Sequence, residues 1–556
     1  MAGNAQYLVQ VLQRAMDHFQ ANRLHDAEGA LRQVLAAEPA NVAALDLLGC
    51  VAQQTGRPEQ ALAFLRRALH IAPYDGFVHF NLGTTLAEQG DCEGALGWFR
   101  RVLVLNPTHD RAQAKCAELL HRLGCYDEAV AWYRRVLNAS PVNAVIHNKL
   151  GNALQHLGRW SEAENHYRLA LQHHSDYPAA FNNLGVVLQR LDQIDEAQRC
   201  YHRALALVPG YGDAHNNLGN LLQERLAMGE AIHHYREAAR YGACTRWNLA
   251  TALLLCGDYA EGLACYEQRF EGAEEAAQAR LTLARLAALP RWQGEDLAGR
   301  PLLVWAEQGL GDTLMMLRYL PLLVGRGVGR IIAAVPAALQ RLVGSMPAVS
   351  EVIGLEAPLP EDVACHCPIM SLPYLFGTRL QTIPPAPYLR VVPALALRWH
   401  ERFARYPGLK VGLVWAGSPG QRKDARRSIP FELLAPLLAI PVQFVSLQKA
   451  ASPSDRRVLD WMAECQDLLD TAALTEALDL VITVDTAVAH LAGALAKPVW
   501  LFNRYESEWR WMLEREDSPW YGTLRIFRQP APRDWASVIA RMAAVLRQRV
   551  VDDTSG

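Results

Sequence analysis

The chain has 556 residues, 51% hydrophobic and 20% charged, which is a globular composition and enough length for about three domains. A formal net charge of −2 gives no general attraction to nucleic acid or to an anionic membrane, so any basic site must be local. No apolar stretch approaches the roughly 18 residues of a membrane span, and no export signal opens the chain. We expect a cytoplasmic protein with no nucleic-acid partner.

The 11 cysteines are scattered, mostly singly, a spacing typical of buried free thiols in a reducing compartment. The closest pair, Cys365 and Cys367, flanks His366, and no second pair is present to complete a zinc site. We therefore predict no metal site.

Residues 8–270 repeat with a period of 34, the length of a tetratricopeptide helix–turn–helix unit. Seven units start near residues 8, 42, 76, 110, 144, 178 and 212. A degenerate eighth, about three residues out of phase, suggests a cap fused to the next domain. Alanines recur where the two helices of a unit cross, at Ala27, Ala61, Ala95, Ala129, Ala163, Ala197 and Ala231. The sequence predicts a tetratricopeptide superhelix with an extended groove over residues 1–270.

The sixth position of the first helices carries a ladder of carboxamides. They are Asn81, Asn183, Asn217 and Asn248, whereas the middle units carry Lys115 and Lys149. An inward-facing carboxamide can donate to and accept from one peptide group, so the ladder predicts that the groove binds an extended protein chain. The two lysines would favour an acidic stretch of that chain. The alternative is a spacer or scaffold, because packing accounts for nearly all of the repeat pattern.

A helical linker is expected over residues 271–293, and a first α/β lobe over residues 294–395, facing the acceptor. A short buried strand at 302–306 leads into a loop with Gly309, Gly311 and Asp312, followed by an apolar helix. The glycines would allow a sharp turn and leave room for a ligand above the strand end. Asp312 fits two roles, a general base near that ligand and an N-cap of the helix.

A second lobe is expected over residues 396–556. After a strand near residues 410–416, the loop that contains Ser418 brings four basic residues within six positions, including Arg427. The next strand ends in Gln448 and Lys449, whose polar groups would meet a nucleotide.

The run Leu480 to Val484 predicts a buried parallel strand, and Asp485 and Thr486 then open a helix of small residues. The first N–H groups of such a helix point outward and attract an anion such as a diphosphate. The alternative is an ordinary crossover in which Asp485 only caps the helix.

The residues 485–492, Asp-Thr-Ala-Val-Ala-His-Leu-Ala, resemble the nucleotide-sugar helix motif Asp-Ser/Thr-Gly-x-x-His-Leu-Ala of heptosyltransferase-like GT-B glycosyltransferases. Ala487 replaces the motif's glycine, and His490 matches its histidine. The Gly-Leu-Gly-Asp loop resembles the family's first-lobe loop, which implies Asp312 as the catalytic base. The resemblance also implies Arg427 as a phosphate ligand, and the asparagine ladder and Lys449 resemble those of O-linked N-acetylglucosamine transferase. The implied donor site comprises Gly309, Gly311, Ser418, Arg427, Gln448, Lys449, Asp485, Thr486, Ala487 and His490.

The whole chain resembles the bacterial protein glycosyltransferases that modify flagellin. The resemblance implies an α-helical tetratricopeptide superhelix followed by an α/β GT-B module of two Rossmann-like lobes, with a C-terminal crossover helix. It implies an inverting, metal-independent enzyme that moves a sugar from a nucleotide sugar to Ser or Thr of a protein acceptor, flagellin, with no further cofactor. The alternatives are transfer to a glycan or lipopolysaccharide core, and a repeat scaffold with an inactive transferase domain. CMP, UDP, GDP and ADP donors all remain open.

Overall fold

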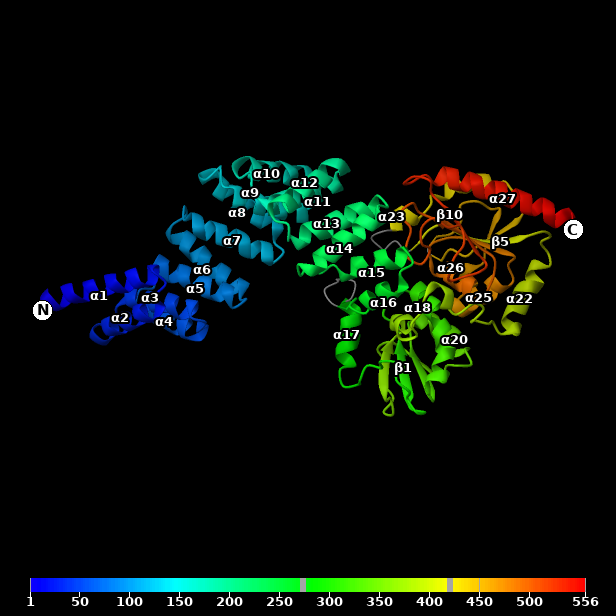
Figure 1. Cartoon of the computed structure of the whole chain (residues 1–556), viewed down its shortest axis with the longest axis horizontal. Coiled ribbons are helices and arrows are strands. Elements are labelled where there is room, and N and C mark those ends of the chain that lie inside the picture. The colour runs from blue at the N-terminus through cyan, green and yellow to red at the C-terminus, as the bar shows by residue number, and fades with distance from the viewer. Residues whose placement is uncertain (1, 271–276, 418–423, 450, 556) are drawn as a thin grey trace. The chain divides into compact units, whose positions relative to one another are not determined.

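The computed structural model describes residues 2–270, 277–417, 424–449 and 451–555. The chain divides into two compact units, Met1–Leu221 and Leu222–Gly556 (Figure 1). The first contains only helices among its described residues, and the second combines helices with two parallel sheets. The sequence predicted a first domain that ends at residue 270, whereas the last pair of repeat helices here belongs to the unit that holds the sheets.

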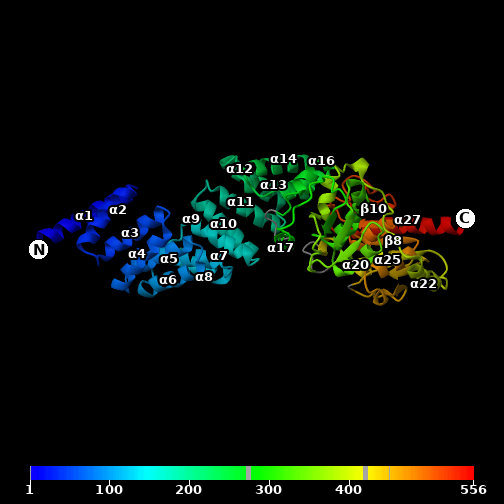
Figure 2. The same cartoon turned by 90° about the horizontal axis from the view of Figure 1, so that it is seen from below.

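The first unit is a run of helix pairs in which each helix from α1 to α12 packs on the next (Figure 2). Its first helices begin at residues 42, 76, 110, 144, 178 and 212 from the second pair onward, so the predicted period is confirmed. The helices are α1 (Ala2–Gln20), α2 (Leu24–Ala37), α3 (Val42–Gln54), α4 (Pro58–Ile71), α5 (Gly76–Glu88), α6 (Cys92–Leu105), α7 (Asp110–Arg122), α8 (Tyr126–Ala139), α9 (Ala144–His156), α10 (Trp160–His173), α11 (Pro178–Arg190), α12 (Ile194–Leu207) and α13 (Gly212–Glu224), in which the unit boundary falls.

Close helix crossing explains the residues that recur with this period. The repeated alanines are fully buried, and a Cβ at Gly151 would lie only 2.6 Å from the ring of Tyr167. Gly185 faces Tyr201 at the same distance in the next repeat. A small residue on the first helix therefore makes room for an aromatic ring on the second in each of these units.

Three more helices continue the pattern in the second unit: α14 (Met228–Arg240), α15 (Arg246–Leu255) and α16 (Tyr259–Tyr266). Helix α15 begins one full repeat period after α13 but has 10 residues, whereas α13 has 13. The shorter helix brings α16 forward by about one turn, which accounts for the phase shift in the sequence.

The smaller sheet has the strand order β3-β2-β1-β4, and all neighbouring strands are parallel. Its strands are β1 (Pro301–Trp305), β2 (Arg330–Ala334), β3 (Glu351–Ile353) and β4 (Cys365–Pro368). Because the order reverses at β1, the loop after β1 opens at a topological switch point, where α/β proteins bind ligands.

The larger sheet has the order β10-β9-β8-β5-β6-β7 and is also parallel throughout. Its strands are β5 (Lys410–Val414), β6 (Gln443–Ser446), β7 (Val458–Asp460), β8 (Leu480–Val484), β9 (Val499–Asn503) and β10 (Leu524–Arg528). The predicted strand 480–484 is confirmed, and all of its residues are buried. The switch point lies between β5 and β8, so the loops after these two strands share one edge.

The helices around the sheets are α17 (Ala277–Arg285), α18 (Leu310–Met316), α19 (Leu320–Leu323), α20 (Ala337–Gly344), α21 (Leu372–Leu375), α22 (Pro393–Phe403), α23 (Asp424–Arg427), α24 (Ala435–Leu438), α25 (Leu468–Glu476), α26 (Ala487–Ala494) and α27 (Trp535–Ser555). Short 3₁₀ helices span Leu317–Tyr319, Val324–Arg326, Ile369–Ser371, Leu380–Thr382, Phe431–Leu434 and Met462–Glu464. Helix α27 packs against α24 and β10 of the larger sheet, whereas the sequence predicted a helix that crosses back to the first lobe (Figure 1). Among the described helices, none is long and apolar enough to span a membrane.

Candidate active site

The two sheets meet where α18, which follows β1, packs against α26, which follows β8. Gly311 in the first turn of α18 makes the contact possible. A Cβ at this position would lie 2.7 Å from the Cδ2 of His490 and 3.6 Å from the Cα of Ala487. The sequence predicted ligand space above Gly311, but the ring of His490 fills that space.

Gly309 is the N-cap residue of α18 and has φ −61°, ψ 164°, angles that any residue can adopt. The predicted glycine-specific turn is therefore not formed there. A Cβ at Gly309 would meet only the carboxylate of Asp312, at 3.6 Å.

Asp312 lies in the first turn of α18 and forms an ion pair with Arg510, which lies in the loop after β9 of the larger sheet. The same guanidinium donates to Glu508 at 2.8 Å and lies 4.6 Å from the ring centroid of Trp509. Burial raises the pKa of Asp312, and the positive charge of Arg510 opposes that rise. Since the N-cap is Gly309, Asp312 is not the N-cap of this helix.

Arg427 lies beside the start of α26, as the sequence predicted. Its Nη1 donates to the main-chain carbonyl of Asp485 at 3.0 Å, and its Nε donates to the carboxylate of Asp424 at 3.0 Å. The guanidinium is thus anchored at the helix mouth and partly neutralised. Ser418, in the same predicted basic loop, lies outside the described residues.

Gln448 and Lys449 follow β6 but differ in environment. The Oε1 of Gln448 accepts hydrogen bonds from the backbone amides of Trp415 at 3.3 Å and Ala416 at 3.0 Å. Gln448 is only 5% exposed. Gln448 therefore holds the end of β5 against β6. Lys449 is exposed beside it. Contact of either residue with a nucleotide stays a prediction.

The start of α26 has no side-chain cap. Thr486 is its N-cap residue, but the hydroxyl makes no capping bond and instead lies 3.1 Å from the hydroxyl of Thr483. The first backbone amides of the helix thus lack a side-chain acceptor from the N-cap residue. Asp485, Thr486 and Ala487 are all half-buried at this mouth.

The carboxyl group of Asp485 at this mouth has a raised pKa. Burial raises its pKa to about 6, Glu508 adds to the rise, and Arg510 and Arg504 oppose it. Burial thus raises the pKa of two carboxyl groups, Asp485 and Asp312, near the meeting point of α18 and α26.

His490 is a core residue, only 3% exposed. Its Nδ1 shares a hydrogen bond with the hydroxyl of Tyr521 at 3.0 Å, and its ring stacks on Trp511 with centroids 5.1 Å apart. Burial and the charges of Arg510 and Arg318 hold the pKa of His490 well below its usual value, so the ring is neutral at pH 7. It joins α26 to α18 and carries no charge for a phosphate.

The sequence interpretation missed the loop after β9, which supplies Arg504, Glu508, Trp509 and Arg510. The sequence does contain a signal for this loop. Glu-Trp-Arg-Trp at 508–511 places charged and aromatic residues after the buried strand β9, which is next to β8. The partner of Arg510, however, lies 198 residues away in the chain.

The last pair of repeat helices forms one wall of this region. The hydroxyl of Tyr259 accepts from the indole of Trp520 at 3.0 Å, and that of Tyr266 donates to Gln308 at 2.9 Å, just after β1. Beyond α16, Arg269 forms an ion pair of 2.6 Å with Glu307, and both side chains are at most 2% exposed. This helix pair is thus part of the sheet unit's core.

In the first unit, the carboxamide ladder links neighbouring repeats. Asn81 donates to the carboxylate of Asp46 at 2.9 Å and 3.0 Å. Asn183 donates to Asn148 at 3.1 Å, and Asn217 to Asn182 at 2.9 Å, each time 35 residues back along the chain. These amide groups therefore already have acceptors, although peptide binding by the half-buried side chains stays a prediction.

Lys115 and Lys149, in the middle of the ladder, both pair with Glu118, Lys115 at 3.0 Å and Lys149 at closer range. The carboxylate partly neutralises both ammonium groups. One net positive charge remains on this group of three residues, so the preference for an acidic stretch stays a prediction. Asn248 lies in α15, within the second unit.

These features define a tetratricopeptide repeat protein that continues into two parallel sheets. Family comparison agrees on the repeats: residues 12–76, 146–172, 178–211 and 245–268 match the tetratricopeptide repeat, and residues 120–158 match the TPR repeat. The chain is related to protein FlbA of Caulobacter vibrioides, with 30% identity over 341 residues, which is 54% of each chain. It therefore spans about half the length of that relative.

Two solved structures are also similar over part of the chain. PilF of Pseudomonas aeruginosa matches 40% of this chain and 99% of its own, with 19% identity and a TM-score of 0.35. A tetratricopeptide repeat protein from Parabacteroides merdae matches 43% and 94%, with 18% identity and a TM-score of 0.36.

Proposed function

We propose that the protein is an inverting, metal-independent GT-B glycosyltransferase that transfers a sugar from a nucleotide sugar to Ser or Thr of a protein held by its repeats. One observation carries the proposal. Helices α18 and α26 meet at the switch points of two parallel sheets, and the half-buried carboxyl group of Asp312 lies at that meeting point.

The start of α26 would bind the donor phosphates. Its first amides lack a side-chain cap and Arg427 is anchored beside them, so positive potential is available without a metal ion. That potential would absorb the charge that develops on the nucleotide phosphate as the bond to the sugar breaks.

Asp312 is the base in this proposal. The acceptor hydroxyl oxygen attacks the anomeric carbon, the bond from that carbon to the phosphate oxygen breaks, and the hydroxyl proton passes to the Asp312 carboxylate. The nucleotide leaves with the bonding electron pair, and the anomeric centre is inverted. Arg510 would keep Asp312 ionised in spite of its burial.

The acceptor is proposed to be flagellin, because the whole chain resembles flagellin-modifying enzymes. The half-buried carboxamides of the repeats would form hydrogen bonds with the backbone of an extended acceptor chain, whatever its side chains are.

A second candidate, a repeat scaffold whose sheet domain is inactive, is favoured by one observation. Two cations of the proposed site are already paired, Arg427 with Asp424, and Arg510 with Asp312 and Glu508. A donor would have to compete with these carboxylates.

Nucleotide binding and transfer together decide between the candidates. Thermal unfolding would be followed with UDP, GDP, ADP and CMP in turn, and a nucleotide at about 100 times its Kd should stabilise the fold by roughly 2.7 kcal/mol. The matching nucleotide sugar should then add one sugar mass to flagellin in an intact-mass measurement. A protein that no nucleotide stabilises and that transfers no sugar would be the scaffold.

A further inference from the structure

The second helices of the repeats carry a row of arginines at one structural position. Three of these arginines pair with a glutamate near the start of the next second helix. The pairs are Arg100 with Glu128 at 3.2 Å, Arg134 with Glu162 at 3.0 Å and Arg168 with Glu196 at 2.9 Å. Exposed pairs of this kind add little stability, but they neutralise the cations along this surface.

The row is interrupted at Arg66. This residue occupies the same position of α4, but the position that corresponds to the glutamates is Gly94 in α6. Within the ranges that the structure describes, Arg66 forms no ion pair. Its exposed guanidinium is therefore a cation without the carboxylate that its counterparts have.

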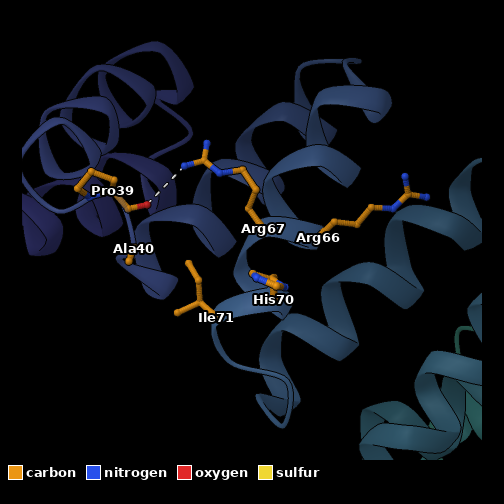
Figure 3. Close-up of a pocket in the computed structure, with 6 residues that line it drawn as sticks. All are labelled: Pro39, Ala40, Arg66, Arg67, His70 and Ile71. Atoms are coloured by element: carbon orange, nitrogen blue, oxygen red, sulfur yellow. Dashed lines mark hydrogen bonds between the residues drawn. The ribbon is translucent and has the colours of Figure 1, made fainter.

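Arg66 lines a surface hollow of about 420 Å³ between α4 and the turn before α3 (Figure 3). The other lining residues are Pro39, Ala40, Arg67, His70 and Ile71. Figure 3 shows Arg66 and Arg67 extending from α4 in opposite directions, with Arg67 donating to the carbonyl of Pro39 at 3.4 Å. The Arg67 guanidinium thus lies on the Pro39 side of the hollow, whereas the Arg66 guanidinium extends away from Pro39 and Ile71.

Exposed apolar side chains also follow the hollow in the chain, on the turn after α4 and at the start of α5. Ile71 is 42% exposed, and the aromatic residues Tyr74 and Phe77 are 82% and 78% exposed. Large aromatic side chains with so little cover are uncommon on a surface that contacts only water.

We propose that this hollow binds a protein segment in which carboxylates flank aliphatic or aromatic side chains. The carboxylates pair with Arg66 and Arg67, and the apolar side chains pack on Ile71, Tyr74 and Phe77. An extended nucleic acid fits less well, because the glutamates at 128, 162 and 196 interrupt the cations along the same surface and would repel phosphates. The site comprises residues of α4, of the turns beside it and of the start of α5, and none of them belongs to the carboxamide ladder.

Binding of a fluorescein-labelled peptide that alternates Glu with Leu to the full chain tests the proposal. Fluorescence anisotropy would compare wild type with Arg66→Ala and Gly94→Glu, the second of which supplies the missing carboxylate. Both changes should weaken binding by roughly tenfold, as expected for loss of one charge-assisted contact. A peptide with Gln in place of every Glu should bind as weakly to wild type.

Two variants serve as matched controls. A Cβ at position 94 would touch the carboxylate of Asp91, which caps α6, so Gly94→Gln imposes the same steric change without the charge. Arg134→Ala removes an arginine from the same structural position where its glutamate is present. Both should bind the peptide within about twofold of wild type.

Three outcomes would overturn the proposal. The first is that wild type shows no measurable binding of the Glu and Leu peptide. The second is that Gly94→Glu and Gly94→Gln lose equal peptide affinity. The third is that single-stranded DNA displaces the peptide when phosphate and carboxylate concentrations are equal.

Discussion

Replacing Asp312 by asparagine separates catalysis from structure at one side chain. The amide keeps the size of the carboxylate but cannot take a proton, so transfer should fall by roughly 10²–10⁴-fold. Arg510 keeps Glu508 as a partner, so the fold should persist. Intact-mass measurement of sugar transfer gives the rate, and calorimetry should find donor affinity unchanged. Near wild-type turnover would send the search for a base elsewhere in the first lobe.

Removing Arg427 should weaken nucleotide binding by roughly 1–3 kcal/mol, because a charge-assisted hydrogen bond to phosphate is lost. Thr486→Val should have a similar effect if the hydroxyl turns from Thr483 to the phosphate. The matched control is Arg426→Ala, since that side chain is 49% exposed and lies 3.8 Å from Glu506. Titration calorimetry measures all three. Equal nucleotide affinity in Arg427→Ala and Arg426→Ala would show that the phosphate does not bind at the start of α26.

Arg510 should set the acid limb of the pH–rate profile. Its charge lowers the pKa of Asp312, so Arg510→Met raises that pKa. The base works only when ionised, and activity in the variant should therefore be lost at a higher pH as the solution is acidified. A shift of about one pH unit or more is expected. A limb that stays in place would show that Asp312 is not the titrating group.

At the scale of elements, the contact between α18 and α26 depends on one missing side chain. Gly311→Ala places a methyl group against the ring of His490. The helices must shift to make room, which should lower the free energy of unfolding by about 1–3 kcal/mol. Gly309→Ala is the control, because φ −61° suits alanine and the nearest atom would be 3.6 Å away. Urea denaturation measures both, and equal stability of the two variants would contradict this account of the contact.

Elements with local signals could be predicted from the sequence. The repeat period located the helices of the first unit, because each repeat packs on its neighbours by the same contacts, and the strand at 480–484 was visible as an apolar run. The pairing of Asp312 with Arg510 could not be read, since it joins residues 198 apart. The burial of His490 likewise depends on Trp511 and Tyr521, which come from a loop with no periodic pattern.

At the scale of the molecule, acceptor recognition and donor binding should be separable by truncation. The truncated protein should begin at Gly212, because α13 and α14 then stay together. A hydrogen bond of 2.9 Å from the Tyr235 hydroxyl to Gln223 joins these two helices. Residues 212–556 should fold and bind nucleotide nearly normally, but should no longer retain flagellin in a pull-down. Flagellin retained as well as by the full chain would place the acceptor site in the second unit.

The buried pair of Arg269 and Glu307 also bears on how this gene can change in length. Whole units between α3 and α12 can be gained or lost in evolution, since each contacts only its neighbours. The last helix pair cannot be exchanged in this way, because Arg269 directly follows α16, and moving it away would leave the buried Glu307 carboxyl group without its partner. Relatives with longer or shorter repeat arrays should therefore differ by whole repeats upstream and keep the short helix α15.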